Sequence, residues 1–330
     1  MPYDVYGVGN ALVDMEHSVD DTYLRDHGIA KGHMTLVDEA RMDTLLASLD
    51  TGKAMRMCGG SAANTTFAVC GFGGTSYYSC RVAGDEAGAY FLAATGSAGV
   101  DTNPHDPNAP GKTGCCLVLV TDDAERSMNT CLGVSDALDT DDINPEALAR
   151  ATYLYMEGYL SSSETGRAAA VHAREVAEAE GVRTSLTLSD PAMVEFFRDG
   201  LTAMLGNGVQ QLFCNEEEAL AWTRTDRIDI AANELCDIAP SVNITLGRAG
   251  CLVATSAGRR LVPGFEVTAN DTTGAGDIYA GACLYVLTRG GSANRAARFA
   301  NYAAAQLVTR YGARLANSGA YRALRNNFRE

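Results

Sequence analysis

The chain has 330 residues, with 46% hydrophobic and 20% charged residues and a mean hydropathy of −0.07, so it is long enough for a large core and typical of a globular protein. No run of about 18 apolar residues occurs, which excludes a membrane-spanning helix. Acidic residues outnumber basic ones 41 to 26, and no Lys/Arg cluster is present to neutralise nucleic-acid phosphates. The first residues lack the basic segment of a signal peptide, and we expect a cytoplasmic protein.

Ten cysteines are spread along the chain without a C-x-x-C pair, and several lie in apolar runs such as residues 115–120. Free, buried thiols in a reducing compartment are therefore expected. The five histidines form neither H-x-x-x-H nor H-E-x-x-H, so the sequence does not support a zinc centre.

Short apolar runs alternate with helix-length periodic segments along most of the chain. The expected strands are residues 5–9, 12–19, 76–83, 153–156, 184–188, 211–213 and 242–246. The expected helices are residues 61–72, 86–98, 164–180 and 292–308, one beginning near residue 277, and a short last one after a break at Gly312. Strands that alternate with helices indicate an α/β fold, with a parallel sheet covered by helices on both faces.

Two stretches, residues 11–38 and 113–133, break this rhythm with alternating patterns and few helical signals. Alternation is typical of half-buried strands, so these stretches predict a small antiparallel sheet that projects from the main body. Such a sheet would make a lid. No repeat or Pro/Ser-rich linker divides the chain, and we expect residues 1–330 to form one domain that carries this lid.

The most informative motif is Asn270-Asp271-Thr272-Thr273-Gly274-Ala275-Gly276-Asp277, which precedes an apolar helix-like run. Small residues at 274–276 allow backbone N–H groups to converge, and the helix start adds free N–H donors, which together predict an anion site. A carboxylate beside that site, Asp277, suits proton abstraction from a hydroxyl during phosphoryl transfer. By spacing alone, a Gly-rich turn before a capping aspartate explains the motif equally well.

The motif resembles the C-terminal signature of the ribokinase-like (PfkB-type) carbohydrate and nucleoside kinases. Five further landmarks are similar to those of the family and occur in family order: Gly59-Gly60-Ser61-Ala62-Ala63-Asn64, Gly84-Asp85 with Gly88, Asn215-Glu216-Glu217-Glu218, residues 245–250, and Phe299-Ala300-Asn301. Within the family, residues 9–14, 113–116, 125–127 and 186–191 resemble the adenosine kinase branch. The resemblance implies a ribokinase-like three-layer α/β/α domain with a mostly parallel central sheet and a small β-sheet lid. It also implies ATP-dependent phosphoryl transfer to the primary (5′) hydroxyl of a nucleoside.

The resemblance assigns roles to individual residues. It implies that Asp277 is the catalytic base, that Gly274, Ala275 and Gly276 form an anion hole, and that Arg126 reaches the phosphates from the lid. Asp14 would hold two sugar hydroxyls, the Gly59-Gly60 turn would let the backbone approach the sugar, and Asn64 would bind another hydroxyl. The remaining candidate contacts of the acceptor are Asn10, Leu12, Leu36, Cys116, Glu157 and Tyr159.

The cofactors implied by the resemblance are ATP and Mg²⁺. Asn215 and Glu218 would organise the metal, Glu218 through water, because Mg²⁺ keeps much of its hydration shell. Thr245, Gly247 and Asn301 would contact the nucleotide. Asp271 and Thr273 occupy positions that bind a monovalent cation such as K⁺ in several relatives. Relatives are monomers or homodimers joined through the lid, and both states are open here.

Two positions depart from the adenosine kinase pattern and leave the acceptor open. Ala192 stands where that branch carries an aromatic residue. Glu157 stands before Gly158 where the branch has a small residue, and a glutamate at this position resembles ribokinase. The alternative is a sugar kinase that acts on ribose, fructose or a related carbohydrate with the same machinery. A non-catalytic binding protein on the same fold would have lost the base or the anion hole, and this sequence keeps both.

Overall fold

The computed structural model describes residues 2–49, 55–123 and 125–329. Within these residues, one large sheet has the strand order β14-β13-β12-β11-β10-β9-β1-β5-β6. The strands from β12 to β6 in this order are parallel, and β13 and β14 add an antiparallel hairpin at one edge. The predicted α/β fold with a mostly parallel sheet is confirmed, whereas the edge hairpin was not predicted.

The large sheet consists of β1 (Tyr3–Val8), β5 (Ser76–Ser79), β6 (Val100–Thr102), β9 (Ala151–Glu157), β10 (Arg183–Thr187), β11 (Gln211–Asn215), β12 (Ser241–Thr245), β13 (Gly250–Thr255) and β14 (Gly258–Pro263). The strand predicted over residues 76–83 ends at Ser79, four residues early. Ser79 pairs with Val8, the last residue of β1, so the neighbouring strand offers no further partner beyond this point.

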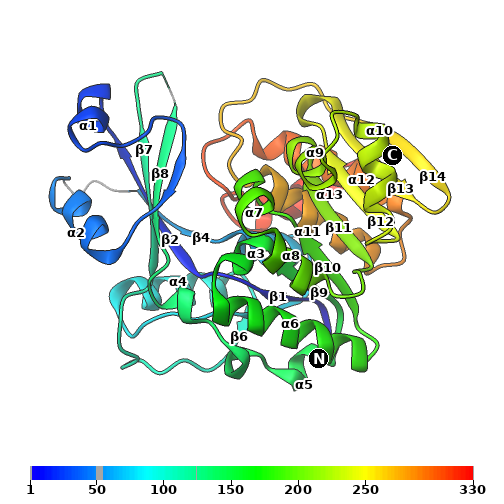
Figure 1. The fold of residues 1–330 in the computed structure, drawn as a ribbon, viewed down its shortest axis with the longest axis horizontal. Helices are drawn as coiled ribbons and strands as arrows, with labels where there is room; N and C mark the ends of the chain where they lie inside the picture. The colour runs from blue at the N-terminus through cyan, green and yellow to red at the C-terminus, as the bar shows by residue number, and fades with distance from the viewer. Residues whose placement is uncertain (1, 50–54, 124, 330) are drawn as a thin grey trace.

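Helices cover both faces of the large sheet (Figure 1). One face packs against α3 (Ser61–Gly71), α4 (Glu86–Ser97), α11 (Ala275–Leu287), α12 (Ala293–Leu307) and α13 (Ser318–Asn327). The other face packs against α5 (Pro145–Leu148), α6 (Glu164–Ala179), α7 (Pro191–Phe196), α8 (Arg198–Leu205), α9 (Glu216–Thr223) and α10 (Ile228–Leu235). Neighbouring residues of β1, such as Val5 and Tyr6, belong to opposite cores because successive strand residues point to opposite faces. Among the described residues, no helix is long and apolar enough to cross a membrane.

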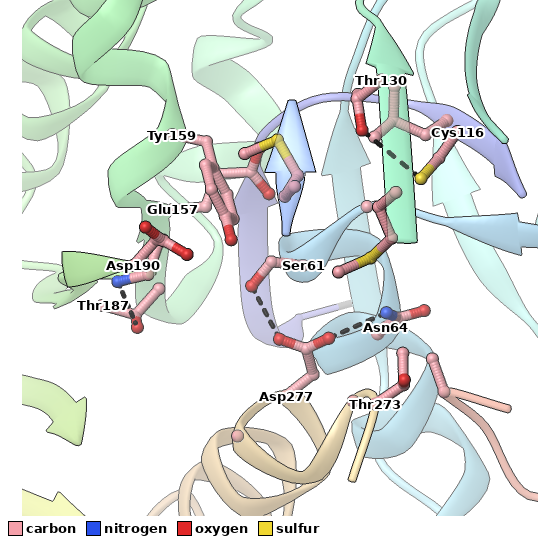
Figure 2. A pocket seen from close by; sticks show the side chains of 18 of the residues that line it. Ser61, Asn64, Cys116, Thr130, Glu157, Tyr159, Thr187, Asp190, Thr273 and Asp277 are labelled. Atoms are coloured by element: carbon pink, nitrogen blue, oxygen red, sulfur yellow. Dashed lines mark hydrogen bonds between the residues drawn. The ribbon is translucent and has the colours of Figure 1, made fainter. Parts of the chain in front are cut away.

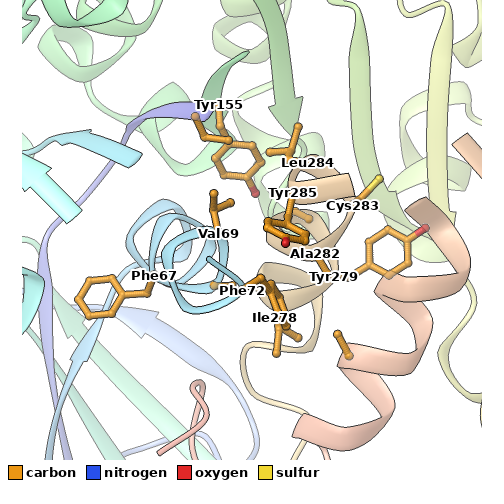
Figure 3. Close-up of a cluster of buried hydrophobic side chains, with 14 of the residues drawn as sticks. Phe67, Val69, Phe72, Tyr155, Ile278, Tyr279, Ala282, Cys283, Leu284 and Tyr285 are labelled. Carbon is orange, nitrogen blue, oxygen red and sulfur yellow. The ribbon is translucent and has the colours of Figure 1, made fainter. Parts of the chain in front are cut away.

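Helices α3 and α11 pack closely, with aromatic and aliphatic side chains around their contact (Figure 3). Gly281 permits this approach, because a Cβ atom there would lie 2.7 Å from the Cβ of Ala68 and from the backbone oxygen of Thr65. The hydroxyl of Thr65 in turn donates to the backbone oxygen of Asp277, at 3.2 Å. The first turns of the two helices are therefore held side by side.

A second, five-stranded sheet projects to one side of the main body (Figure 1). Its strand order is β3-β8-β7-β2-β4, with bounds β2 (Leu12–Ser18), β3 (Met34–Leu36), β4 (Met55–Gly59), β7 (Gly114–Val120) and β8 (Arg126–Cys131). Helices α1 (Asp21–Asp26) and α2 (Glu39–Ala47) pack on the face turned away from the main body, through residues such as Leu24 and Leu45.

The small sheet corrects three details of the predicted lid. It is mixed rather than antiparallel, because β2 pairs with β7 and β3 with β8 in parallel register. Its fifth strand, β4, lies outside the predicted segments 11–38 and 113–133, and residue 124 of the second segment lies outside the described residues. Helix α1 falls within the first segment, where Asp20 caps it by accepting from the backbone N–H of Tyr23.

Candidate active site

A cavity of about 480 Å³ lies between the two sheets, a volume typical of small-molecule sites. Its floor is formed where parallel strands of the large sheet end, through residues at or next to the ends of β1, β9, β10, β11 and β12: Asn10, Glu157, Thr187, Asn215 and Thr245. Open α/β sheets bind ligands at this carboxyl edge. The opposite wall is the small sheet, so both sheets contribute to one site (Figure 2).

Each strand of the small sheet contributes alternate residues to the cavity. Leu12, Asp14 and Glu16 of β2 line it, while Val13 and Met15 pack into the hydrophobic cores. The same two-residue period selects the other lining residues of this sheet: Met34 and Leu36 of β3, Met57 of β4, Cys116 and Val118 of β7, and Arg126, Met128 and Thr130 of β8. The alternation that predicted strands therefore also determines which side chains reach the cavity.

The start of α11 has the geometry of an anion site. Gly274 precedes the helix with φ +73°, a left-handed conformation, and a Cβ atom there would lie 2.5 Å from the backbone oxygen of Ala313. Gly274, Ala275 and Gly276 line the cavity beside Asp277. The first N–H groups of a helix have no acceptor within the helix, so this turn presents donors and the positive end of the helix dipole to a ligand.

The Asp277 carboxylate is held by two side chains from α3 (Figure 2). Its Oδ1 accepts from the Ser61 hydroxyl at 2.7 Å, and its Oδ2 accepts from the Asn64 amide at 2.8 Å. Burial raises the pKa of Asp277, and the two hydrogen bonds oppose that shift by favouring the ionised form. A carboxylate with a raised pKa beside an anion site is suited to take a proton from a hydroxyl.

Asp14 lies in the wall of the same cavity, on β2. Burial raises its pKa to about 7, while the positive charge of Arg314 opposes the shift. Gly59, opposite Leu12 in the strand pairing, makes room for the carboxylate, because a Cβ atom at Gly59 would overlap the Asp14 oxygens. Gly59 itself does not line the cavity, whereas Gly60 does, with φ +93°.

Glu157, at the end of β9, is fully buried and already has partners. Its two oxygens accept the backbone N–H groups of Asn10 at 2.7 Å and of Ala62 at 2.8 Å. It thereby joins the end of β1 to the start of α3, which carries Ser61 and Asn64. Burial raises the pKa of Glu157 to about 7. The predicted substrate residue thus lines the cavity and also holds together the two segments that build it.

Arg126 connects the small sheet to the loop before α11. Its guanidinium donates to Asp271 at 2.6 Å, to Thr273 at 3.1 Å and to Glu16 at 2.9 Å. The other contacts of the Asp271 carboxylate are the backbone N–H groups of Gly312 and Thr273. The two residues predicted to bind a monovalent cation therefore bind a cationic side chain of the protein itself.

The predicted nucleotide residues fall into three places. Asn215 and Thr245 line both the main cavity and a shallow neighbouring hollow, and Gly247 lines the hollow alone. Asn301 lines neither; its amide donates to the backbone oxygens of Val262 and Pro263, so it attaches α12 to the end of β14.

Glu218 is the residue predicted to hold Mg²⁺ through water. Its two oxygens accept from the backbone and side-chain N–H groups of Asn215 in a capping box, and burial raises its pKa to about 7. Because both oxygens are already hydrogen-bonded, Glu218 is suited to contact the water shell of Mg²⁺ rather than the ion itself. Phosphate groups would then hold the metal directly. In the described part of the chain, no group of three acidic, histidine or cysteine side chains forms a ready-made metal centre.

Four of the predicted acceptor contacts, Leu12, Leu36, Cys116 and Tyr159, fall where adenosine kinases line the base pocket. All four line the cavity, with Cys116 accepting from the Thr130 hydroxyl. Ala192 does not line it, and Met193 does. Sequence reasoning missed Glu16, Ser61, Asp190 and Arg314. Ser61 had a signal, because it lies three residues before Asn64 and so on the same helix face. Nothing in the sequence around Arg314 indicated that its side chain donates to Asn64.

Comparison with known proteins agrees with this geometry. The family model of the pfkB carbohydrate kinases matches residues 36–318. The fold superimposes on the adenosine kinase of Sinorhizobium meliloti with a TM-score of 0.90 and 33% identity, and on a probable sugar kinase of Rhizobium etli with a TM-score of 0.90 and 31% identity, each over 98% of both chains. The ATP-dependent ribose-1-phosphate kinase of Halopiger xanaduensis is 32% identical over 258 residues, 78% of this chain and 82% of that protein.

The chain therefore belongs to the pfkB family of carbohydrate kinases. Its fold is ribokinase-like, with a large mostly parallel sheet and a second small sheet. It is a phosphotransferase that acts on a hydroxyl group of a nucleoside or a sugar. The relatives act on acceptors of both kinds, so similarity alone does not define the acceptor.

Proposed function

We propose that this protein transfers the γ-phosphoryl group of ATP to the 5′-hydroxyl of a nucleoside, as adenosine kinases do. The observation that carries the proposal is the apolar wall on the small-sheet side of the cavity. Met34, Leu36 and Met128 come from adjacent strands β3 and β8, and Leu12, Cys116 and Leu132 extend the wall. Thioether and aliphatic groups are suitable contacts for the flat faces of a nucleobase, and the Tyr159 ring adds an aromatic surface.

The charge of the cavity supports an uncharged substituent on the sugar. Six carboxylate residues line it: Asp14, Glu16, Asp190, Glu157, Glu218 and Asp277. Arg126 contributes a positive charge, but it is already paired with Glu16 and Asp271. Arg126 is the one Lys or Arg side chain among the described lining residues, so the lining offers a phosphate on the sugar C1 no unpaired cationic side chain, which disfavours ribose 1-phosphate as the acceptor.

The proposed roles follow from the contacts. Asp14 would accept two ribose hydroxyls, and Gly60 and Asn64 would hold the sugar beside Asp277. Asp277 would take the hydroxyl proton while the hydroxyl oxygen bonds to the γ-phosphorus, and the bond from that phosphorus to the bridging oxygen of ADP breaks. Backbone N–H groups of residues 274–276 would stabilise the charge on the moving phosphoryl group. Mg²⁺, held through water near Asn215 and Glu218, would neutralise the phosphates of ATP.

A free sugar is the second candidate acceptor. Glu157 favours it, because a buried glutamate beside the sugar site matches the ribokinase pattern, as does the similarity to a probable sugar kinase. However, both Glu157 oxygens already accept backbone N–H groups, which leaves this carboxylate less available for sugar hydroxyls.

An ADP-release assay with ATP and Mg²⁺, with and without K⁺, tests the proposal on adenosine, inosine, guanosine, cytidine, ribose, ribose 1-phosphate and fructose. We expect turnover of a nucleoside and none of ribose 1-phosphate. Leu36→Gln should raise the KM for the nucleoside at least several-fold, because Leu36 lines the apolar wall. The fold should tolerate the substitution, because this side chain is already 47% exposed. Leu261→Gln is the matched control, because Leu261 is also an exposed strand leucine, on β14, and lies outside the cavity. Turnover of free sugars alone would refute the nucleoside assignment.

A further inference from the structure

Arg314 contacts Asn64, one of the two side chains that hold Asp277. It belongs to the segment between α12 and α13, whose residues Gly312 and Ala313 line the cavity, although the Arg314 side chain is not among the described lining groups. Its Nε donates to the Asn64 Oδ1 at 2.6 Å, and the centre of its guanidinium lies 3.6 Å from the centroid of the Phe67 ring. The guanidinium therefore contacts two residues of α3 one helical turn apart.

The hydrogen bonding determines which way the Asn64 amide faces. An arginine side chain can only donate, so the oxygen of Asn64 must face Arg314 and its nitrogen must face the other way. That nitrogen donates to Oδ2 of Asp277. With the amide reversed, two donors would meet at Arg314 and two acceptors would meet at Asp277. The hydrogen bond to Arg314 thus orients the Asn64 amide so that its nitrogen donates to Asp277.

We propose that Arg314 is a positioning residue for phosphoryl transfer, which acts through Asn64 to hold the Asp277 carboxylate in its working orientation and adds a positive charge to the acceptor site. This inference rests on the proposed role of Asp277 as the base. It adds to that role a chain of two hydrogen bonds, from Arg314 to Asn64 and from Asn64 to Asp277, that joins α11 to the segment before α13 through α3.

The charge of Arg314 acts on both carboxylates of the acceptor site. It opposes the effect of burial on the pKa of Asp14 and on that of Asp277, so it favours their ionised forms. The titratable groups around Arg314 itself are Asp14 on β2, Cys58 on β4, Asp277 on α11 and Tyr321 on α13. Those around Asp277 are Asp14, Tyr78 on β5, Tyr155 and Glu157 on β9, Tyr159, Arg314 and Tyr321.

A purely structural role explains the arginine less well. Its Nη2 atom is buried and meets no oxygen or nitrogen acceptor among the described residues. The thiol of Cys58, a weak acceptor, lies beside the guanidinium, and a buried donor without a good partner is destabilising. A methionine would keep apolar contact with Phe67 and remove this donor. Core packing alone therefore gives little reason for an arginine here, whereas orientation of Asn64 and support of two carboxylates require a cationic donor.

The test compares Arg314→Met and Arg314→Lys in the full chain, with adenosine and ATP as substrates, by kcat/KM against pH. We expect Arg314→Met to lower kcat/KM roughly 10- to 100-fold and to move the acidic limb of the profile to higher pH by about one unit. Arg314→Lys should largely restore the position of the limb, because it keeps the charge, but only part of the rate. Arg289→Met is the matched control, since that guanidinium lies 3.8 Å from the Tyr285 ring at the far end of α11. It should change neither quantity.

A double-mutant cycle tests the route through Asn64. The cycle is measured at a pH above the acidic limb, where the carboxylates are ionised in every variant. If Arg314 orients Asp277 through Asn64, Arg314→Met combined with Asn64→Ala should there be no slower than the slower single variant. Independent effects that multiply, or a lower melting temperature with an unmoved acidic limb, would overturn the proposal. If Asp277→Asn keeps wild-type turnover, the proposed base is wrong. If Asp277→Asn is inactive while Arg314→Met behaves like wild type, the positioning role alone is wrong.

A second readout needs no acceptor. Burial raises the pKa of Asp277 above its unfolded value, so its contribution to stability is present at low pH and is lost as pH rises through the folded-state pKa. In urea unfolding of the ligand-free chain, Arg314→Met should extend this loss to higher pH. Adding Asp277→Asn should remove part of the extension. Identical pH profiles for wild type and Arg314→Met would contradict the charge effect, whatever the acceptor proves to be.

Discussion

Replacement of Asp277 by asparagine removes the proposed base and leaves its hydrogen bonds satisfiable. The asparagine oxygen would accept from the Asn64 amide, and its nitrogen would donate to the Ser61 hydroxyl, which can also accept. The substitution also removes a charge that burial disfavours, as the raised pKa of Asp277 indicates. We therefore expect a variant that folds at least as stably as wild type and has lost phosphoryl transfer.

The size of the loss follows from the role of the residue. A positioned general base contributes about 10²- to 10⁴-fold, so kcat should fall by that factor, equivalent to about 3–5 kcal/mol in activation free energy. The anion site uses backbone N–H groups at residues 274–276, which the substitution leaves in place. The Kd for ATP should therefore change by less than about threefold, which corresponds to less than about 0.7 kcal/mol in binding free energy.

The assay measures ADP release at saturating ATP and acceptor, with ATP affinity measured by calorimetry and stability by thermal unfolding. Asp199→Asn is the matched control, because Asp199 also lies in the first turn of a helix, α8, but away from the cavity. Turnover of Asp277→Asn within about tenfold of wild type would refute the assignment of the base. An inactive variant that is also unfolded would refute the stability reasoning.

Four further predictions concern the rest of the site. Glu157→Gln should lower the free energy of unfolding by about 1–3 kcal/mol, because one of two buried backbone N–H groups loses its acceptor; an unchanged urea midpoint would contradict this. The value of kcat/KM should fall about tenfold per pH unit below about pH 7, because Asp14, with a pKa of about 7, must be ionised to accept two hydroxyls; a profile flat down to pH 5.5 would exclude this. Gly274→Ala should weaken ATP binding and lower stability by about 1 kcal/mol or more, because φ is +73° and the backbone of Ala313 is close, and wild-type affinity in calorimetry would argue against the anion site. Chelation of Mg²⁺ by EDTA should abolish turnover, with recovery on adding excess Mg²⁺.

The sequence by itself determined the family fold and the position of the proposed anion site. The alternation of apolar runs and periodic helices predicted the parallel sheet, because central strands such as β9 and β11 are buried on both faces and a covering helix such as α6 is buried on one. The motif at residues 270–277 predicted both Gly274 before the helix start and the carboxylate at Asp277, because small residues and a helix N-terminus are local features. Alternation in residues 12–19 likewise predicted a strand, and its two-residue period places Asp14 and Leu12 on one face.

Only the tertiary structure decided which distant residues share one site. Ser61 and Asn64 reach Asp277 because Gly281 lets α3 and α11 approach, and that contact joins segments more than 200 residues apart. The pairing of Arg126 with Asp271 depends in the same way on the packing of the small sheet against the main body. Such contacts depend on which helix faces meet, which a single sequence does not state. Local spacing therefore predicted an anion site beside Asp277, and the family resemblance supplied the proposed role of Asp277 as base. The partners of these groups and the raised pKa values arise from burial in the assembled fold.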